Sequence, residues 1–132
     1  MTAADTGTRS RTLRGVTLTS GALAFGCALL AVGHLGLQVP VLSALGPGGG
    51  RPVVPAAIAF AVAAIAHGLV CFGVVRRRSW AWPLGVLIAA LTLVGAATPF
   101  RGVMSAVGIA LAGVELALLL TPDGRRLLRG AT

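Results

Sequence analysis

Glu115 is the residue whose chemistry is most unusual for its surroundings, because it is an acid inside a long apolar segment. It occurs in VMSAVGIALAGVELALLL, at 103–120, which contains no other charged residue. An ionised carboxylate deep in a hydrocarbon layer costs at least ~2.5 kcal/mol. We therefore expect the Glu115 side chain to face other helices and not lipid.

His67 is the residue predicted to pair with Glu115. It lies in another apolar segment, 56–75, and both segments would cross a bilayer in the same direction. A helical rise of ~1.5 Å per residue then places the two side chains at similar depth. The pair has two interpretations. A hydrogen bond of this kind fixes helix packing and contributes ~0.6 kcal/mol, whereas a carboxylate beside an imidazole could relay protons. We prefer the first, because one acid and one histidine are few for a transport path.

Cysteine and metal chemistry have less support in the sequence. Cys27 and Cys71 lie in different apolar segments and at different depths, whereas a disulfide needs Cα atoms within about 7 Å of each other. His67 and Cys71 have the i, i+4 spacing of two metal ligands, and Glu115 is the one further ligand within reach. A metal site needs three or four ligands with supporting hydrogen bonds. We therefore expect free thiols, no metal and no cofactor.

The segments that must position these residues are predicted to be membrane spans. Of 132 residues, 56% are hydrophobic and only 11% are charged, whereas soluble domains carry about a quarter charged residues. A bilayer core needs ~20 apolar residues of helix. Because lipid offers no hydrogen-bond partner to the backbone, such segments must be helical. Four stretches between charges qualify: 16–37, 56–75, 80–97 and 102–120.

These spans predict the fold class and the division of the chain. We expect an all-α polytopic membrane protein with four transmembrane helices in a compact bundle over 16–120. A short basic tail at 1–15 precedes the bundle, and a second basic tail at 121–132 follows it.

Arginine placement predicts the orientation. Two arginines, Arg51 and Arg101, fall in the first and third connections between spans, and the other nine fall before the first span, in the second connection or after the fourth span. The positive-inside rule then predicts a bacterial cell-membrane protein with both termini in the cytoplasm.

The residues between the second and third spans are expected to anchor the chain at anionic headgroups on the cytoplasmic side. These anchors are Arg76, Arg77, Arg78, Trp80 and Trp82. Basic runs can also bind nucleic acid, but these flank apolar spans and lack interleaved aromatic residues that could stack on bases. We therefore expect no nucleic-acid partner.

Small residues at helical spacing predict the faces through which the spans pack. Ser105, Gly108 and Ala112 share a face with Glu115. Small residues let helices approach closely, so we expect these faces to join the four helices, or to join the bundle to a second copy of the chain or to another membrane protein. Corresponding faces on the other spans consist of Ala59, Ala63, His67 and Cys71; of Gly85, Ala89, Thr92 and Ala96; and of Ala22, Gly26 and Gly33.

The segments VVRRRSWAW at 74–82 and LLLTPDGRRLLRG at 118–130 give the chain a family likeness. Together with alanine-, leucine-, glycine- and valine-rich spans and arginine without lysine, they make the chain resemble small uncharacterised four-helix membrane proteins of actinobacterial type. That resemblance implies a plasma-membrane protein. The helix count and single membrane carboxylate are also similar to those of small multidrug-resistance transporters, although the glutamate of that family lies in the first helix and Glu115 lies in the fourth span.

The function predicted from the sequence is that of a non-enzymatic scaffold or accessory subunit, which packs through its small-residue faces. No Walker loop, GxSxG or HExxH motif occurs, which excludes an ordinary kinase or hydrolase. The alternative is a minimal proton-coupled transporter that uses Glu115 with His67. The scaffold is favoured because the predicted spans supply no polar lining for a cavity and the sequence has few groups that titrate.

Overall fold

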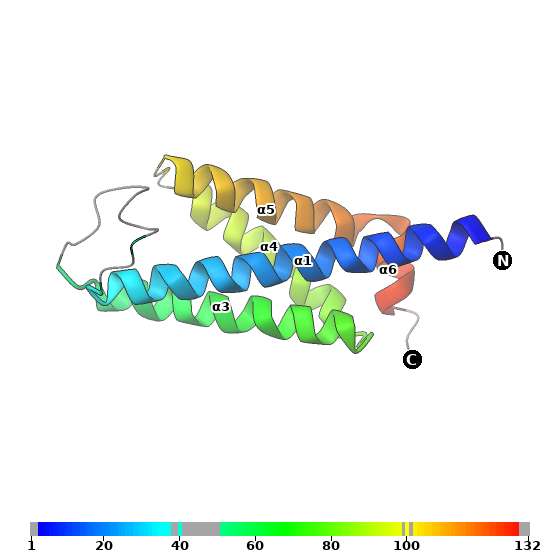
Figure 1. Cartoon of the computed structure of the whole chain (residues 1–132), viewed down its shortest axis with the longest axis horizontal. Coiled ribbons are helices and arrows are strands. Elements are labelled where there is room, and N and C mark those ends of the chain that lie inside the picture. The colour runs from blue at the N-terminus through cyan, green and yellow to red at the C-terminus, as the bar shows by residue number, and fades with distance from the viewer. Residues whose placement is uncertain (1–2, 38–39, 41–50, 99, 101, 130–132) are drawn as a thin grey trace.

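The computed structural model describes residues 3–37, 40, 51–98, 100 and 102–129, and the side chains among them from 11 to 126. The described residues contain no strand, so the predicted all-α fold class is confirmed. The helices are α1 (Ala3–His34), α3 (Val54–Val75), α4 (Ala81–Ala97), α5 (Val103–Leu120) and α6 (Pro122–Arg129) (Figure 1).

Three of these helices are long and apolar enough to cross a membrane, namely α1 over Arg11–His34, α3 and α5. The helix α4 is equally apolar but has 17 residues, which is the lower limit of the range of ~17–25 that transmembrane helices cover. Three of the predicted spans are therefore candidate membrane-spanning helices by length and composition, and a fourth span at α4 stays a prediction.

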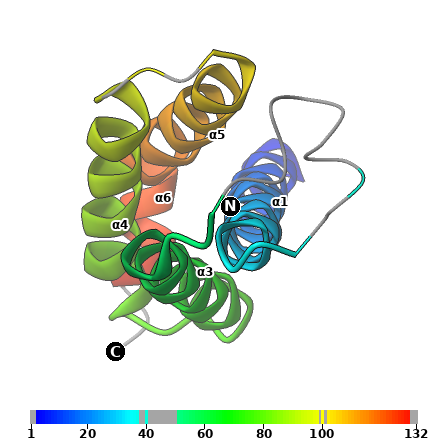
Figure 2. The same cartoon turned by 90° about the vertical axis from the view of Figure 1, so that its left-hand side faces the viewer.

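Helices α1 and α3 run antiparallel along the long axis and α5 runs in the direction of α3, whereas α4 crosses obliquely (Figures 1 and 2). The helix α1 packs mainly against α3, and α4 packs mainly against α5, while contacts of α1 with α5 and of α3 with α4 close the bundle (Figure 2). Both termini lie at the same end, together with α6 and the connection between α3 and α4 (Figure 1). We call this end of the bundle the arginine end, because exposed arginines gather there. The described ones are Arg11, Arg14, Arg76, Arg77, Arg78, Arg125 and Arg126.

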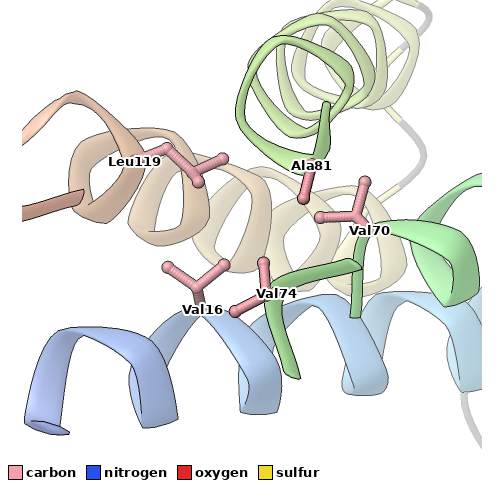
Figure 3. Packing of buried hydrophobic residues seen from close by; sticks show 5 residues of the cluster. All are labelled: Val16, Val70, Val74, Ala81 and Leu119. Atoms are coloured by element: carbon pink, nitrogen blue, oxygen red, sulfur yellow. The ribbon is translucent and has the colours of Figure 1, made fainter. Parts of the chain in front are cut away.

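The apolar core of the bundle combines residues from four helices. Its buried cluster consists of Val16 from α1, Val70 and Val74 from α3, Ala81 from α4 and Leu119 from α5 (Figure 3). The four helices can meet here because α4 presents glycine at position 85. A Cβ atom at Gly85 would lie 2.9 Å from Cδ1 of Leu119 and 3.2 Å from Cγ1 of Val70, so glycine permits the close approach of α4 to both neighbours.

The helix α1 differs from the predicted span at both ends. It begins at Ala3 rather than at Val16, because residues 3–15 contain no proline and continue the helix of the span. It ends at His34 and not at Leu37, since the chain turns at Gly36, whose φ is +83°. The backbone N–H of Val53 then donates to the carbonyl of His34 at 2.8 Å, which ties the start of α3 to the end of α1.

The predicted C-terminal tail contains the short helix α6. Thr121 ends α5 and also caps α6, because its Oγ1 accepts a hydrogen bond from the backbone N–H of Gly124 at 3.1 Å. Proline at the first helical position and an acid, Asp123, in the first turn favour this helix start. The chain therefore turns sharply at the arginine end and continues as helix to Arg129.

Candidate functional site

Four polar side chains form a chain across the bundle interior, one from each of α1, α3, α4 and α5. Ser20 Oγ donates a hydrogen bond to Oε1 of Glu115. The other carboxylate oxygen, Oε2, lies 3.4 Å from Nδ1 of His67. On the far side of the imidazole, Nε2 lies 3.0 Å from Oγ1 of Thr92. We call these four residues the polar network.

Helical spacing brings each member of the polar network to the inner face of its helix. Ser20 belongs to a buried stripe of α1, while His67 precedes Val70 on the buried face of α3. Thr92 follows the buried Ala89 by three residues on α4, and Glu115 lies between the buried Ala112 and Leu119 on α5. The stripe of α1 consists of Val16, Ser20, Leu23, Cys27 and Ala31.

Three of the four members of the polar network are enclosed by protein, and Thr92 is half-buried. Ser20, His67 and Glu115 are each 0% exposed. Burying a charge is costly unless it is paired and hydrogen-bonded, and Ser20 satisfies one carboxylate oxygen of Glu115. The distance of 3.4 Å between His67 Nδ1 and Glu115 Oε2 exceeds the usual 2.7–3.2 Å of an N–H···O bond. These two buried atoms therefore face each other without a hydrogen bond to any described residue.

The hydroxyl of Thr92 can pair with Nε2 of His67 whichever form the imidazole takes. In a neutral His67 with its hydrogen on Nδ1, the N–H points to Glu115 and Nε2 accepts from Thr92. In a protonated His67, both ring nitrogens donate, and Thr92 accepts at 3.0 Å. The Thr92 hydroxyl can donate or accept by rotation, so Nε2 of His67 keeps a hydrogen-bond partner in either form of the ring.

Sequence reasoning paired Glu115 with His67, and the structure brings these side chains together. The sequence did not point to Ser20. It placed Thr92 on a packing face of the third span, without a polar partner. The signal for Ser20 is its position in a stripe of α1 that continues from Val16 at intervals of four, three, four and four residues. Ala22, on the predicted face of α1, is exposed, because it lies about 200° around the helix from Ser20. A contact of Ala22 with a second copy of the chain or a partner stays a prediction.

The predicted packing face of α5 lies inside the bundle. Ser105 and Ala112 are buried, and Gly108 is half-buried. A Cβ atom at Gly108 would lie 3.4 Å from Cβ of Ala96. This part of α5 therefore packs closely against α4.

The predicted packing face of α3 is only partly inside. Ala63 and Cys71 are half-buried, and the thiol of Cys71 donates to the carbonyl of Thr17 at 3.7 Å. Ala59 is exposed in the single chain, so its contact with a second copy of the chain or with another membrane protein stays a prediction. A row of residues four apart drifts around the helix, and Ala59 lies about 80° from His67.

Most of the predicted anchors are exposed at the arginine end. Arg76, Arg77 and Arg78 are exposed, and Trp80 is 41% exposed. Trp82 is half-buried and its indole Nε1 donates to the carbonyl of Leu119 at 2.8 Å. This carbonyl lies in the last turn of α5, where backbone acceptors lack helical partners. Trp82 therefore joins the start of α4 to the end of α5.

The remaining candidate chemistry is sparse. Cys27 and Cys71 are free thiols. The described residues contain no group of three or more histidine, cysteine, aspartate or glutamate side chains that could hold a metal ion. Glu115 and His67 supply two such side chains, and the other members of the polar network are hydroxyls.

No protein-family model matches the chain, and no curated protein or solved structure matches it. What this chain can do is inferred from the polar network, the close helix contacts around it and the apolar outer surface.

Proposed function

We propose that this protein is a non-enzymatic scaffold or accessory subunit of a bacterial cell membrane. Four spans form its bundle, both termini lie in the cytoplasm, and the polar network fixes the arrangement of the helices. The outer surface then contacts lipid, or the helices of a partner. That partner is another membrane protein or a second copy of the chain.

The outer surface of the bundle supports a membrane position for all four helices. Large apolar side chains are exposed on each of them, including α4, and water would make such a surface unfavourable. A lipid or protein environment removes that cost. Examples are Leu18 and Phe25 on α1, Ile58 and Ile65 on α3, Leu87 and Leu91 on α4, and Val107 and Val114 on α5.

The enclosure of the polar network is the observation that carries the structural role. Ser20, His67 and Glu115 have no exposed surface. Two hollows on the described surface, one between α1 and α3 and one at the start of α6, are lined by other residues. A transporter binds its substrate at a site that opens alternately to the two sides of the membrane. A closed network that joins four helices is better suited to fixing their packing.

A minimal proton-coupled transporter that uses Glu115 with His67 is the second candidate. The facing atoms Nδ1 of His67 and Oε2 of Glu115 favour it, because they are buried, 3.4 Å apart and without hydrogen bonds to described residues. Such a pair could exchange a proton if the bundle opened. The two functions therefore differ in whether the carboxyl group of Glu115 must titrate.

Substitution of Glu115 by glutamine and by leucine distinguishes the two functions. In a scaffold, Glu115→Gln should melt near the wild-type temperature in mild detergent, because an amide still accepts from Ser20. Glu115→Leu should be less stable by about 1 kcal/mol, because the hydrogen bonds between helices are lost. Thermal unfolding of the purified variants measures both effects.

A measurement of proton release on ligand addition tests the transporter against the scaffold. Tetraphenylphosphonium, a hydrophobic cation, is added to the unbuffered protein in detergent, and the pH is recorded for the wild type and for Glu115→Gln. The scaffold predicts no release from either protein. Release from the wild type that Glu115→Gln abolishes while remaining folded would reject the scaffold in favour of the transporter.

A further inference from the structure

A groove lies between α1 and α3 at the arginine end. Its volume is about 450 Å³, within the range of roughly 300–1,000 Å³ that is usual for sites of small molecules. Its lining combines two arginines, Arg14 and Arg77, with apolar residues of both helices. The apolar residues that matter here are Leu13, Leu18, Val74 and Val75.

The two arginines of the groove are available to an anion. Both are exposed, and among the described side chains neither guanidinium forms an ion pair. The whole chain contains three acids against 11 basic residues, so acids that could neutralise the arginine end are few. An anionic ligand would therefore complement the charge of this groove.

Arg77 occupies a backbone position that normally favours glycine. Its φ is +51°, in the left-handed region. The N–H of Arg77 donates to the carbonyl of Val74 at 3.0 Å, and that of Arg78 donates to the carbonyl of Gly73 at 2.8 Å. This pair of bonds is the Schellman motif that ends many helices, and its left-handed residue is usually glycine. The chain keeps a guanidinium beside the groove although glycine would suit the backbone better.

We propose that this groove binds one anionic glycerophospholipid. Its phosphate would contact Arg14 and Arg77, because guanidinium groups bind phosphate oxygens with paired, charge-assisted hydrogen bonds. Its acyl chain would lie against Leu18, Val74 and Val75. The inference rests on the membrane position in the proposed function, but not on the scaffold role.

Lipid titration of the purified protein in a zwitterionic detergent tests the site. Native mass spectrometry counts the retained phosphatidylglycerol, and thermal unfolding records the stabilisation that the lipid causes. The wild type should retain one molecule and melt at a higher temperature with it. Arg14→Gln and Arg77→Gly should each bind about fivefold more weakly, the contribution of one basic residue to attraction of an anionic headgroup.

Two comparisons make the test specific to the groove. Arg78→Ala removes the same charge from the neighbouring residue, which does not line the groove, and it should bind phosphatidylglycerol like the wild type. Arg77→Gly should melt above the wild type in the absence of lipid, because glycine relieves the left-handed backbone, while losing the rise that lipid causes. A variant that is merely destabilised would instead melt below the wild type in the absence of lipid.

Three outcomes would overturn the proposal. Equal weakening by Arg14→Gln, Arg77→Gly and Arg78→Ala would show diffuse attraction to surface charge. An equal thermal shift with glycerol phosphate would show a site for small anions, and equal retention of phosphatidylcholine would show that charge is not recognised. Extraction of the protein from membranes by alkaline carbonate would instead reject the membrane position, so the two failures can be told apart.

Discussion

Glu115 shows how a carboxylate is accommodated in an interior whose buried side chains are mostly apolar. Ser20 donates to one of its oxygens, and His67 lies 3.4 Å from the other. Thr92 in turn holds the imidazole at 3.0 Å. Ser20 therefore offsets part of the cost of burying the carboxylate, while Thr92 positions the imidazole that lies beside the other oxygen.

Replacing Ser20 by alanine should destabilise the protein by about 1–2 kcal/mol, because Oε1 of Glu115 loses its donor inside a closed interior. Ser79→Ala is the matched control, since Ser79 is exposed in the connection between α3 and α4, and it should be neutral. In a Glu115→Leu background the effect of Ser20→Ala should largely disappear, because the hydroxyl then has no carboxylate to serve. Thermal unfolding of the wild type, Ser20→Ala, Glu115→Leu and the double variant measures the coupling between Ser20 and Glu115. An equal loss of stability from Ser20→Ala in both backgrounds would contradict the contact.

The helix α4 is positioned by its small residues. Gly85 and Ala89 are buried and Thr92 reaches His67, so one face of the helix contributes both to the core and to the polar network. Trp82 adds a hydrogen bond to the end of α5. The helix can therefore be short and still be held on two sides.

Two glycines of α4 should respond in opposite ways to substitution by alanine. Gly85→Ala should lower the melting temperature, because the new Cβ would lie 2.9 Å from Leu119 Cδ1 in a packed core. Gly95→Ala should be neutral or stabilising by up to about 1 kcal/mol, since nothing lies within 4 Å of an added Cβ and alanine favours helix. Detergent thermal unfolding of both variants checks the pair, and a similar loss at both positions would argue against the close contact at Gly85.

At the scale of the whole molecule, charge is distributed unevenly along the bundle. Both termini and the connection between α3 and α4 lie at the arginine end (Figure 1). An arrangement of this kind favours one orientation in a membrane, because basic connections remain in the cytoplasm.

Reporter fusions should give an alternating topology. Fusions after Arg51 and after Arg101 should be active outside the cytoplasm, whereas fusions after Arg78 and at the C-terminus should be active inside. The reason is the excess of nine arginines over two on the predicted cytoplasmic side. An alkaline phosphatase and a green fluorescent protein fusion at each site give complementary signals. A C-terminus outside the cytoplasm, or a fusion after Arg101 inside it, would contradict the four-span orientation.

The sequence alone determined the properties that depend on position along the chain. Long uncharged stretches predict helices, and alternation of their direction predicts that His67 and Glu115 lie at similar depth. A constant rise per residue makes such depth estimates accurate without knowledge of packing. The uneven distribution of arginine is likewise visible without coordinates.

Only the tertiary structure decided which side of each helix faces inward. It placed Ser20 inside and Ala22 outside, left Ala59 exposed, and brought Arg14 beside Arg77 in one groove. In a soluble protein the inner face of a helix is apolar and the outer face is polar, so the sequence distinguishes them. Here both faces are apolar, because lipid is as hydrophobic as the interior. The choice between faces depends instead on the fit of side chains from different helices, and no local pattern in the sequence contains that information.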